Sequence, residues 1–185
     1  MINEKIICAG FGGQGVMLMG QLLAYSANDN DLNTLWYPSY GPETRGGTAN
    51  CSVTISEQKV NSPVISQADS IFIMNSPSLD KFESKVRPGG RILINSSLVE
   101  RKINRDDIEA YYIPVNDIAV KLGNPRVANM VMIGAYLQLT KLFEKEEVLK
   151  ILKKSFGEAK AHLIEINDEA IEAGKKYIQE NYEKK

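Results

Sequence analysis

The sequence predicts a single α/β domain built on a mainly parallel sheet, and three observations support this. Short apolar runs rich in β-branched residues alternate with helical patterns along most of the 185 residues. A glycine-rich turn at residues 10–15 joins the first apolar run to an apolar helix. The composition, 43% hydrophobic and 24% charged, is that of a globular chain that buries one core. We therefore expect one three-layer domain over residues 1–185, with a helical C-terminal third.

The glycine turn organises the N-terminal part of the chain. Residues 5–9 are typical of a strand and residues 16–24 of a helix. Gly10, Gly12 and Gly15 have G-x-G-x-x-G spacing between the two. Glycine permits positive φ and lets another group approach the main chain, and a helix start favours an anion. The turn therefore predicts an anion site or, alternatively, a tight packing point for another backbone.

A dinucleotide site needs more than these glycines. It also carries an acidic residue about 20 residues further on, at the end of the second strand, that binds the ribose. The second strand is expected at residues 34–37 and is followed by Pro38 and Ser39, whereas Asp29 and Asp31 precede it. The sequence therefore predicts a Rossmann-like fold but disfavours an NAD site within it.

The segment 37–47 is the second unusual stretch. Its two prolines and three glycines exclude regular structure, and it carries Tyr40, Glu43 and Arg45. Loops that follow parallel strands emerge at the carboxyl edge of the sheet, so we expect this loop beside the glycine turn. Arg45 is expected either to bind an anion as a fork or to pair with Glu43 and fix the loop.

The middle of the chain adds further strands. Residues 48–56 alternate in polarity, and with residues 59–60 as a second arm they predict an antiparallel hairpin inserted after the second strand. Asn75 and Asn95 each end a buried strand, so their amides are expected at the carboxyl edge as ligands or as caps. The remaining expected strands and turn are 70–75, 91–95, 111–115 and the turn 87–90.

Helical patterns dominate after residue 115. The pattern at 126–142 is apolar over a wide arc, which predicts a helix buried in the core or against a partner. Asn167 is expected to cap the last helix, which runs to about residue 182. The other helices are expected at 76–85, 117–122 and 144–155.

Composition excludes several classes of function. A net charge of −1 gives no electrostatic basis for binding nucleic acid or an anionic membrane. We expect no bilayer-spanning segment and no secretory signal, and a cytoplasmic protein. Cys8 and Cys51 are expected as buried free thiols, too few for an iron–sulfur cluster, and His162 lacks a partner for a metal. Because no nucleophile set, Walker lysine or carboxylate pair is present, the chain is expected to complete a site whose chemistry lies elsewhere.

Several motifs follow one another along the chain: F-G-G-Q-G-V at 11–16, Y-G-P-E-T-R-G-G at 40–47, S-P at 62–63, N-S-P-S-L-D-K-F at 75–82 and P-G-G at 88–90. Together they resemble the gamma subunit of 2-oxoacid:ferredoxin oxidoreductases over essentially the whole chain. The loop at 40–47 looks closest to the 2-oxoglutarate branch. The resemblance implies an enzyme that converts 2-oxoglutarate, coenzyme A and oxidised ferredoxin into succinyl-CoA, carbon dioxide and reduced ferredoxin.

The resemblance also implies which subunits bind the cofactors. Thiamine diphosphate with Mg2+ and iron–sulfur clusters belong to alpha and beta partner subunits, with a ferredoxin-like delta subunit or an external ferredoxin as electron acceptor. This chain alone would bind no cofactor, and coenzyme A would bind in the assembled hetero-oligomer. Alternatives are a gamma-type subunit of a pyruvate, branched-chain 2-oxoacid or indolepyruvate enzyme, a stand-alone nucleotide-binding protein, or an interaction scaffold.

The two loops supply the candidate site residues. We expect them to bind a cofactor or to form a subunit interface, and we expect neither a catalytic residue nor a metal ligand. The candidates are Gly10, Gly12, Gly13, Gln14, Gly15, Tyr40, Gly41, Pro42, Glu43, Arg45, Gly46, Gly47 and Asn75.

Overall fold

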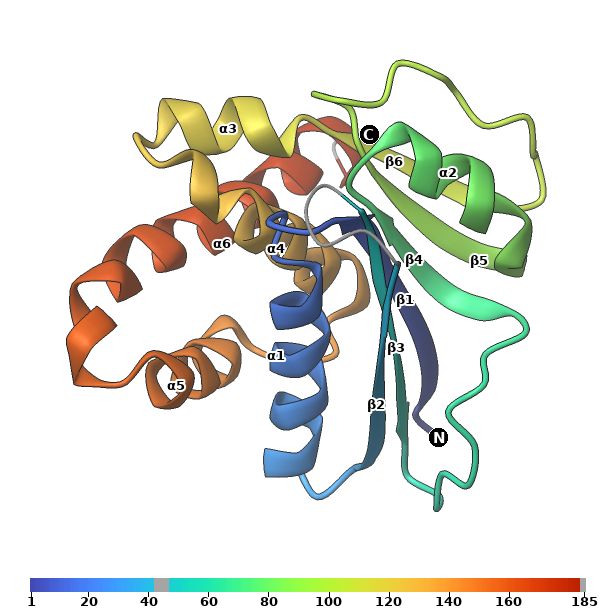
Figure 1. The fold of residues 1–185 in the computed structure, drawn as a ribbon, viewed down its shortest axis with the longest axis horizontal. Helices are drawn as coiled ribbons and strands as arrows, with labels where there is room; N and C mark the ends of the chain where they lie inside the picture. Colours follow the sequence, from blue (N-terminus) through green and yellow to red (C-terminus); the bar gives the residue numbers. More distant parts are fainter. Residues whose placement is uncertain (42–46, 184–185) are drawn as a thin grey trace.

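A six-stranded sheet with strand order β2-β3-β1-β4-β5-β6 forms the centre of the molecule (Figure 1). The computed structural model describes residues 1–41 and 47–183. Neighbouring strands β1, β4, β5 and β6 pair in parallel, and β3 joins β1 and β2 through antiparallel pairing. The strands are β1 Asn3–Phe11, β2 Asn33–Tyr40, β3 Thr48–Ser56, β4 Ala68–Ile73, β5 Val86–Asn95 and β6 Glu109–Ile113. The predicted α/β class and mainly parallel sheet are confirmed.

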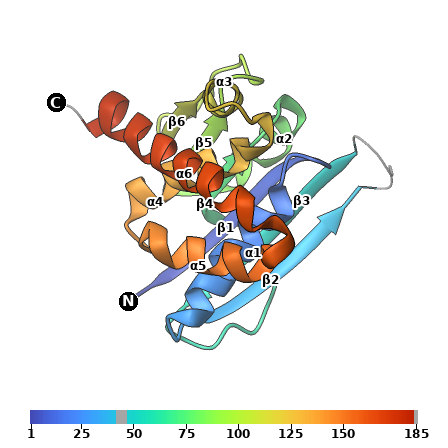
Figure 2. The same ribbon diagram turned by 90° about the vertical axis from the view of Figure 1, so that its left-hand side faces the viewer.

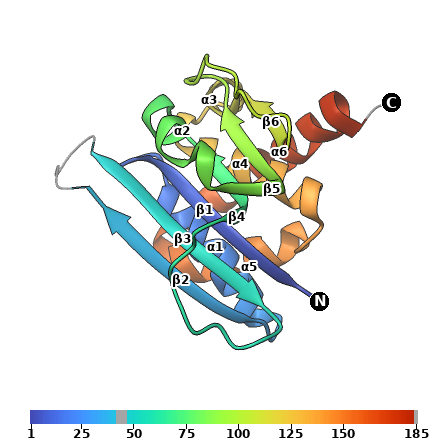
Figure 3. The ribbon, with the colours of Figure 1, turned by 90° about the vertical axis from the view of Figure 1, so that its right-hand side faces the viewer.

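Helices cover the two faces of the sheet unequally. On one face α1 and α4 pack on the sheet, and α5 and α6 pack on these helices, around a large apolar core (Figure 2). The other face packs against α2 in a smaller core that includes Ile71, Leu79 and Phe82. On that face the connection 57–67 crosses β2 and β3 (Figure 3). The helices are α1 Val16–Asp29, α2 Ser76–Phe82, α3 Val115–Lys121, α4 Ala128–Thr140, α5 Lys145–Phe156 and α6 Ile164–Ile178.

The antiparallel hairpin exists, but its predicted second arm is wrong. β3 pairs with β2 on one side and with β1 on the other over most of its length. Both hydrogen-bonding edges of β3 are therefore occupied, and Lys59 and Val60 lie outside any strand. The hairpin is formed by β2 and β3, and β2 itself continues through Pro38 to Tyr40.

Three local predictions are also corrected. The expected turn at 87–90 lies inside β5, where the pairing with β4 shifts register and Gly89 takes a φ of 74°. Asn167 does not cap α6, because the helix starts at Ile164 and the Asn167 amide donates to the Leu163 carbonyl at 2.6 Å. α3 starts at Val115, two residues before the start expected at 117.

The long apolar helix α4 is buried within this chain. Every residue from Ala128 to Gln138 is buried. A Cβ at Gly134 would overlap the Ile171 carbonyl, and one at Gly174 would overlap the Val131 carbonyl. α4 and α6 therefore pack backbone against backbone. The apolar arc was expected to be buried either in the core or against a partner. Burial in the core of this chain accounts for it without a partner.

Candidate functional site at the glycine turn

The glycine turn lies where β1 ends and α1 begins. Gly13 and Gly15 have φ values of 92° and 72°, a left-handed conformation that favours glycine. The Gly15 carbonyl accepts the first helical hydrogen bond, from the Met19 N–H at 3.1 Å. The start of the 14-residue helix α1 therefore faces the carboxyl edge of the sheet, as the spacing predicted.

Gln14 holds the turn in place. Its Oε1 accepts from the Phe11 N–H at 2.7 Å and from Asn75 Nδ2 at 3.1 Å. Its Nε2 donates to the Met74 carbonyl at 3.2 Å. The structure thus brings Gln14 and Asn75 together, and both use their amides within the protein. Asn75 also caps α2, because its Oδ1 accepts from the Ser78 N–H at 3.0 Å.

The glycines of the turn divide into two kinds. A Cβ at Gly10 would lie 2.7 Å from Gln14 Oε1 and 2.9 Å from the Met74 Cβ, and one at Gly15 would overlap the Asn129 side chain. A Cβ at Gly12 or Gly13 would meet nothing within 4 Å. Gly10 and Gly15 therefore serve internal packing, whereas Gly12 and Gly13 have open space where a side chain would lie.

The second loop meets the glycine turn, as predicted. The Gly12 N–H donates to the Gly47 carbonyl at 3.1 Å, and the Gly41 N–H donates to the Thr48 carbonyl at 2.7 Å. Tyr40 is 70% exposed and lines a hollow together with Gly12 and Gly13. The candidates Pro42, Glu43, Arg45 and Gly46 lie outside the described residues, so both expectations for Arg45 stay predictions.

A small cavity of about 80 Å3 lies beside the turn. Its lining includes Asn116, Arg126 and Asn129, which sequence reasoning missed because they come from the α3–α4 region more than 100 residues later. No carboxylate lines this cavity among the described residues. A helix start, amides and one exposed arginine suit an anionic group.

Asn95 lies at the same edge, as expected, and acts within the protein. Its Nδ2 donates to the Met74 carbonyl at 3.1 Å and to Asn116 Oδ1 at 2.7 Å. Its Oδ1 accepts from the Ser97 N–H at 3.2 Å. Asn95 therefore connects the end of β5 to the end of β4 and to α3.

The strand order disfavours a dinucleotide site. In the dinucleotide-binding fold the second strand lies next to the first and carries the ribose-binding carboxylate. Here β3 separates β2 from β1, and β2 ends in Ser39 and Tyr40. The end of β2 is therefore one strand further from the turn than such a site requires.

The two cysteines are buried free thiols, as predicted. Cys8 and Cys51 lie opposite each other on β1 and β3. Burial and the neighbouring Cys51 raise the pKa of the Cys8 thiol. The part of the chain that the structure describes holds no group of three or more His, Cys, Asp or Glu that would suit a metal. It also contains no helix with the length and apolar character needed to cross a membrane.

Residues 5–177 match the family described as "Pyruvate ferredoxin/flavodoxin oxidoreductase". This chain belongs to that family. Within the family, the chain is 40% identical over 181 residues to "Ketoisovalerate oxidoreductase subunit VorA" of Methanothermobacter thermautotrophicus. That match covers 97% of this chain but 37% of the relative. A relative of similar length is "2-oxoglutarate synthase subunit KorC" of Methanocaldococcus jannaschii, 35% identical, with 83% of this chain and 84% of the relative covered.

A solved member of the family has the same fold. It is the keto/oxoacid ferredoxin oxidoreductase gamma subunit from Geobacter sulfurreducens, with a TM-score of 0.78 and 29% identity. The alignment covers 94% of this chain and 96% of that one. The predicted resemblance to the oxidoreductase gamma subunits is confirmed. The chain spans about a third of the length of the VorA relatives that it matches.

Proposed function

We propose that this chain is the gamma-type subunit of a 2-oxoacid:ferredoxin oxidoreductase located in the cytoplasm. In the proposed reaction a 2-oxoacid, coenzyme A and oxidised ferredoxin give an acyl-CoA, carbon dioxide and reduced ferredoxin. The family match over residues 5–177 carries the proposal. The proposed partners are alpha and beta subunits and a ferredoxin-like delta subunit or an external ferredoxin.

The residues of this chain agree with a supporting subunit. The whole sequence has two cysteines, and both lie buried on neighbouring strands, whereas an iron–sulfur cluster takes four thiolates. They do not fit a cluster. We assign thiamine diphosphate with Mg2+ and the clusters to the partners, where they supply the redox chemistry.

The open part of the glycine turn is where this chain meets the reaction in our proposal. Gly12 and Gly13 face open space, the start of α1 lies behind them, and Arg126 lines the adjacent cavity. These groups favour a phosphate of coenzyme A. A second role is favoured by the exposed Tyr40 beside the same glycines, because such an arrangement also suits close packing of a partner backbone.

The proposed substrate is 2-oxoglutarate, with a branched-chain 2-oxoacid as the second candidate. The KorC relative supports 2-oxoglutarate, because this chain covers 84% of it. The VorA relative supports a branched-chain substrate, because its identity of 40% exceeds the 35% of the KorC relative. A pyruvate or indolepyruvate enzyme remains among the alternatives to be tested.

The proposal is tested on the native complex. A tagged copy of this chain is purified from its source cells, and coenzyme A-dependent dye reduction is measured with 2-oxoglutarate, 2-oxoisovalerate, pyruvate and indolepyruvate. Co-purifying subunits with thiamine diphosphate, iron and activity on 2-oxoglutarate are the expected result. Activity on 2-oxoisovalerate alone would show that a branched-chain 2-oxoacid, and not 2-oxoglutarate, is the substrate. A chain that purifies alone and inert would contradict the proposed function.

A further inference from the structure

A groove of about 310 Å3 lies on the face of the sheet that α2 covers only in part. Three side chains in register, Ile7 of β1, Ser52 of β3 and Tyr37 of β2, contribute to its lining. The connection 57–67 crosses the same strands (Figure 3), and the Ser52 hydroxyl donates to the Pro63 carbonyl at 3.2 Å. The groove shares no lining residue with the glycine turn.

The groove is bordered by exposed apolar side chains. Tyr37 is 55% exposed and Val64 is 77% exposed, and both line it. Lys85 also lines the groove, next to Phe82, whose ring lies 5.5 Å from the Lys85 ammonium. A small ligand would leave the outer surfaces of Tyr37 and Val64 in water. A protein surface would bury them, which is the arrangement found at interface cores.

The neighbouring sheet edge does not suit pairing with another strand. The Gly41 N–H donates to the Thr48 carbonyl, which makes these two residues a hydrogen-bonded pair. In an antiparallel ladder every second pair is hydrogen-bonded, so this pair fixes which pairs of β2 and β3 exchange hydrogen bonds. Pro38 opposite Cys51 falls between such pairs, and its nitrogen therefore faces the outer edge of β2. Proline has no N–H to donate, so it interrupts strand addition there.

At the opposite edge of the sheet, this chain itself occupies the backbone groups of Tyr112 on β6. The Tyr182 hydroxyl accepts from the Tyr112 N–H at 2.8 Å and lies 3.3 Å from the Tyr112 carbonyl, to which it donates. The Tyr182 ring also packs edge-on against Tyr111 of β6. Because Tyr182 occupies the β6 edge at Tyr112 and Pro38 interrupts the β2 edge, a partner is expected to dock on the sheet face.

We propose that a larger partner polypeptide of the oxidoreductase, corresponding to the rest of the VorA relative, covers this groove, with an apolar side chain between Tyr37 and Val64 and a carboxylate facing Lys85. The inference rests on the proposed function. The VorA relative carries about 63% of its length beyond the part that matches this chain, in one polypeptide. In the proposed complex the gamma-type subunit lacks the effective concentration that such a covalent link gives, so it needs a dedicated surface to hold its partner.

The test uses a matched pair of variants in the tagged complex. Val64→Asp places a charge at the groove, and Val120→Asp places the same charge on α3, where Val120 is 59% exposed. We expect Val64→Asp to retain less than a tenth of the larger polypeptide, and Val120→Asp to retain the wild-type amount. Melting temperatures of the isolated chains are expected to match the wild type. Tyr37→Ser against Tyr25→Ser, 55% and 52% exposed, gives a second matched pair.

Two results would overturn the inference. The first is equal retention of the larger polypeptide by both aspartate variants and by both serine variants. The second is an isolated wild-type chain that sediments as a dimer and becomes a monomer with Val64→Asp, because a second copy would then occupy the groove. Failure of the proposed function is seen separately, as a wild-type complex without 2-oxoacid-dependent activity.

Discussion

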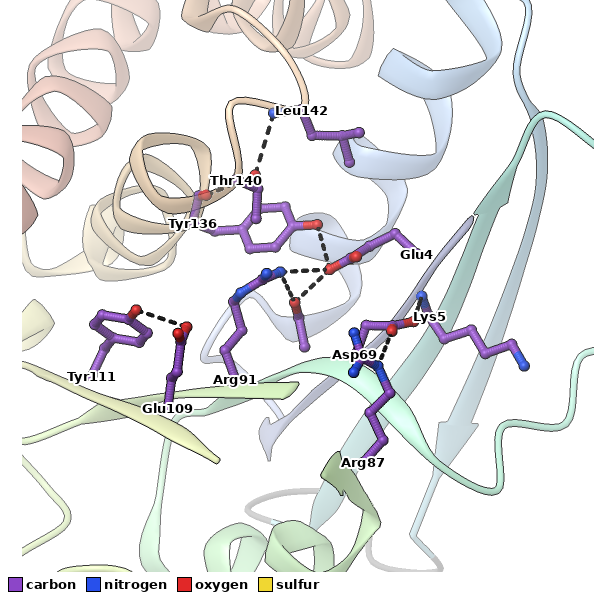
Figure 4. A network of polar contacts seen from close by, with 11 residues as sticks. Glu4, Lys5, Asp69, Arg87, Arg91, Glu109, Tyr111, Tyr136, Thr140 and Leu142 are labelled. Atoms are coloured by element: carbon purple, nitrogen blue, oxygen red, sulfur yellow. Dashed lines mark hydrogen bonds and ion pairs between the residues drawn. The ribbon is translucent and has the colours of Figure 1, made fainter. Parts of the chain in front are cut away.

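The hydroxyl of Tyr136 on α4 donates to the Glu4 carboxylate on β1 at 3.2 Å, although 132 residues separate them in sequence (Figure 4). The same carboxylate oxygen accepts from the Ser70 hydroxyl at 2.5 Å and from Arg91 Nη1 at 3.1 Å. Tyr136 is fully buried and its ring packs edge-on against Phe72. One carboxylate thus ties α4 to three strands at the end of the sheet opposite the glycine turn.

Tyr136→Phe tests this link. The change removes one hydrogen bond to a charged acceptor, while Ser70 and Arg91 still satisfy the carboxylate. We expect the free energy of unfolding to fall by about 1–2 kcal/mol. Urea denaturation of the isolated chain measures it, with Tyr25→Phe at an exposed site as the control. Equal stability of the two variants would show that the buried contact contributes nothing.

The pH dependence of stability tests the burial of Glu4. Burial is the main cause that raises the pKa of the Glu4 carboxyl above its ordinary 4.5, and the Asp69 charge adds to it. The hydrogen bond from Ser70, the charge of Arg91 and the hydrogen bond from Tyr136 lower the pKa in part. The folded state therefore holds the proton more tightly than the unfolded chain. This contribution to stability is fully present below pH 4.5 and is lost as pH rises through the folded pKa.

Glu4→Gln removes that contribution. The wild type should lose stability relative to this variant as pH rises from about 4 to 7, by about 1.4 kcal/mol for each unit by which the pKa is raised. Unfolding free energies at a series of pH values provide the comparison, with Glu57→Gln at an exposed position as the control. If the unfolding free energy of the wild type minus that of the variant stays constant or rises with pH, the predicted loss of stability with rising pH is wrong.

Gln14→Ala tests the role of the amide in the glycine turn. The change leaves the Phe11 N–H and the Asn75 amide without their shared acceptor. We expect a loss of about 1–3 kcal/mol in the unfolding free energy, because a partly buried donor is left unpaired. Thermal or urea unfolding checks this, and Gln67→Ala at an exposed site should cost less than about 0.5 kcal/mol.

The sequence predicts what depends on nearby residues. The strand–turn–helix unit at residues 3–29 follows from glycine spacing and apolar periodicity, both of which act within a few residues. The capping role, one of the two expectations for Asn75, is local for the same reason, since Asn75 ends one strand and caps the next helix. The helix α5 follows from its apolar periodicity in the same way, and α4 follows from a pattern that is apolar over a wide arc.

Long-range pairing is what the sequence does not reveal. Asn129 fills the space that glycine leaves at Gly15, yet it lies 114 residues later and carries no local signal. The register that places β3 between β1 and β2 decides against the predicted 59–60 arm, and it depends on contacts between distant strands. Asn167 matched a capping pattern, but the preceding turn 158–163 leads directly into α6.

Arg126 and Arg45 are the two candidate cations for an anionic ligand. Arg126 is exposed at the cavity beside the turn. The contact of Arg45 with an anion is predicted from the sequence alone. Either change to alanine should raise the KM of the complex for coenzyme A at least threefold if that arginine contacts a phosphate. For Arg126→Ala the melting temperature of the isolated chain should move by less than about 2 °C, because a substitution at an exposed position costs little stability. Unchanged KM values for both variants would remove both residues from the site.

The division of the glycines gives the most direct test of the site. Gly15→Ala should destabilise the isolated chain by more than about 2 kcal/mol, because φ is positive and the Cβ overlaps Asn129. Gly12→Leu should change that stability by less than about 1 kcal/mol, because its side chain would enter open space.

The decisive measurement is the turnover of the purified complex that carries Gly12→Leu. If the open space beside Gly12 and Gly13 receives coenzyme A or a partner backbone, turnover should fall at least tenfold while the isolated chain keeps its melting temperature. Turnover within twofold of the wild type, in a complex with the normal subunit content, would contradict a role for this turn in the function of the oxidoreductase.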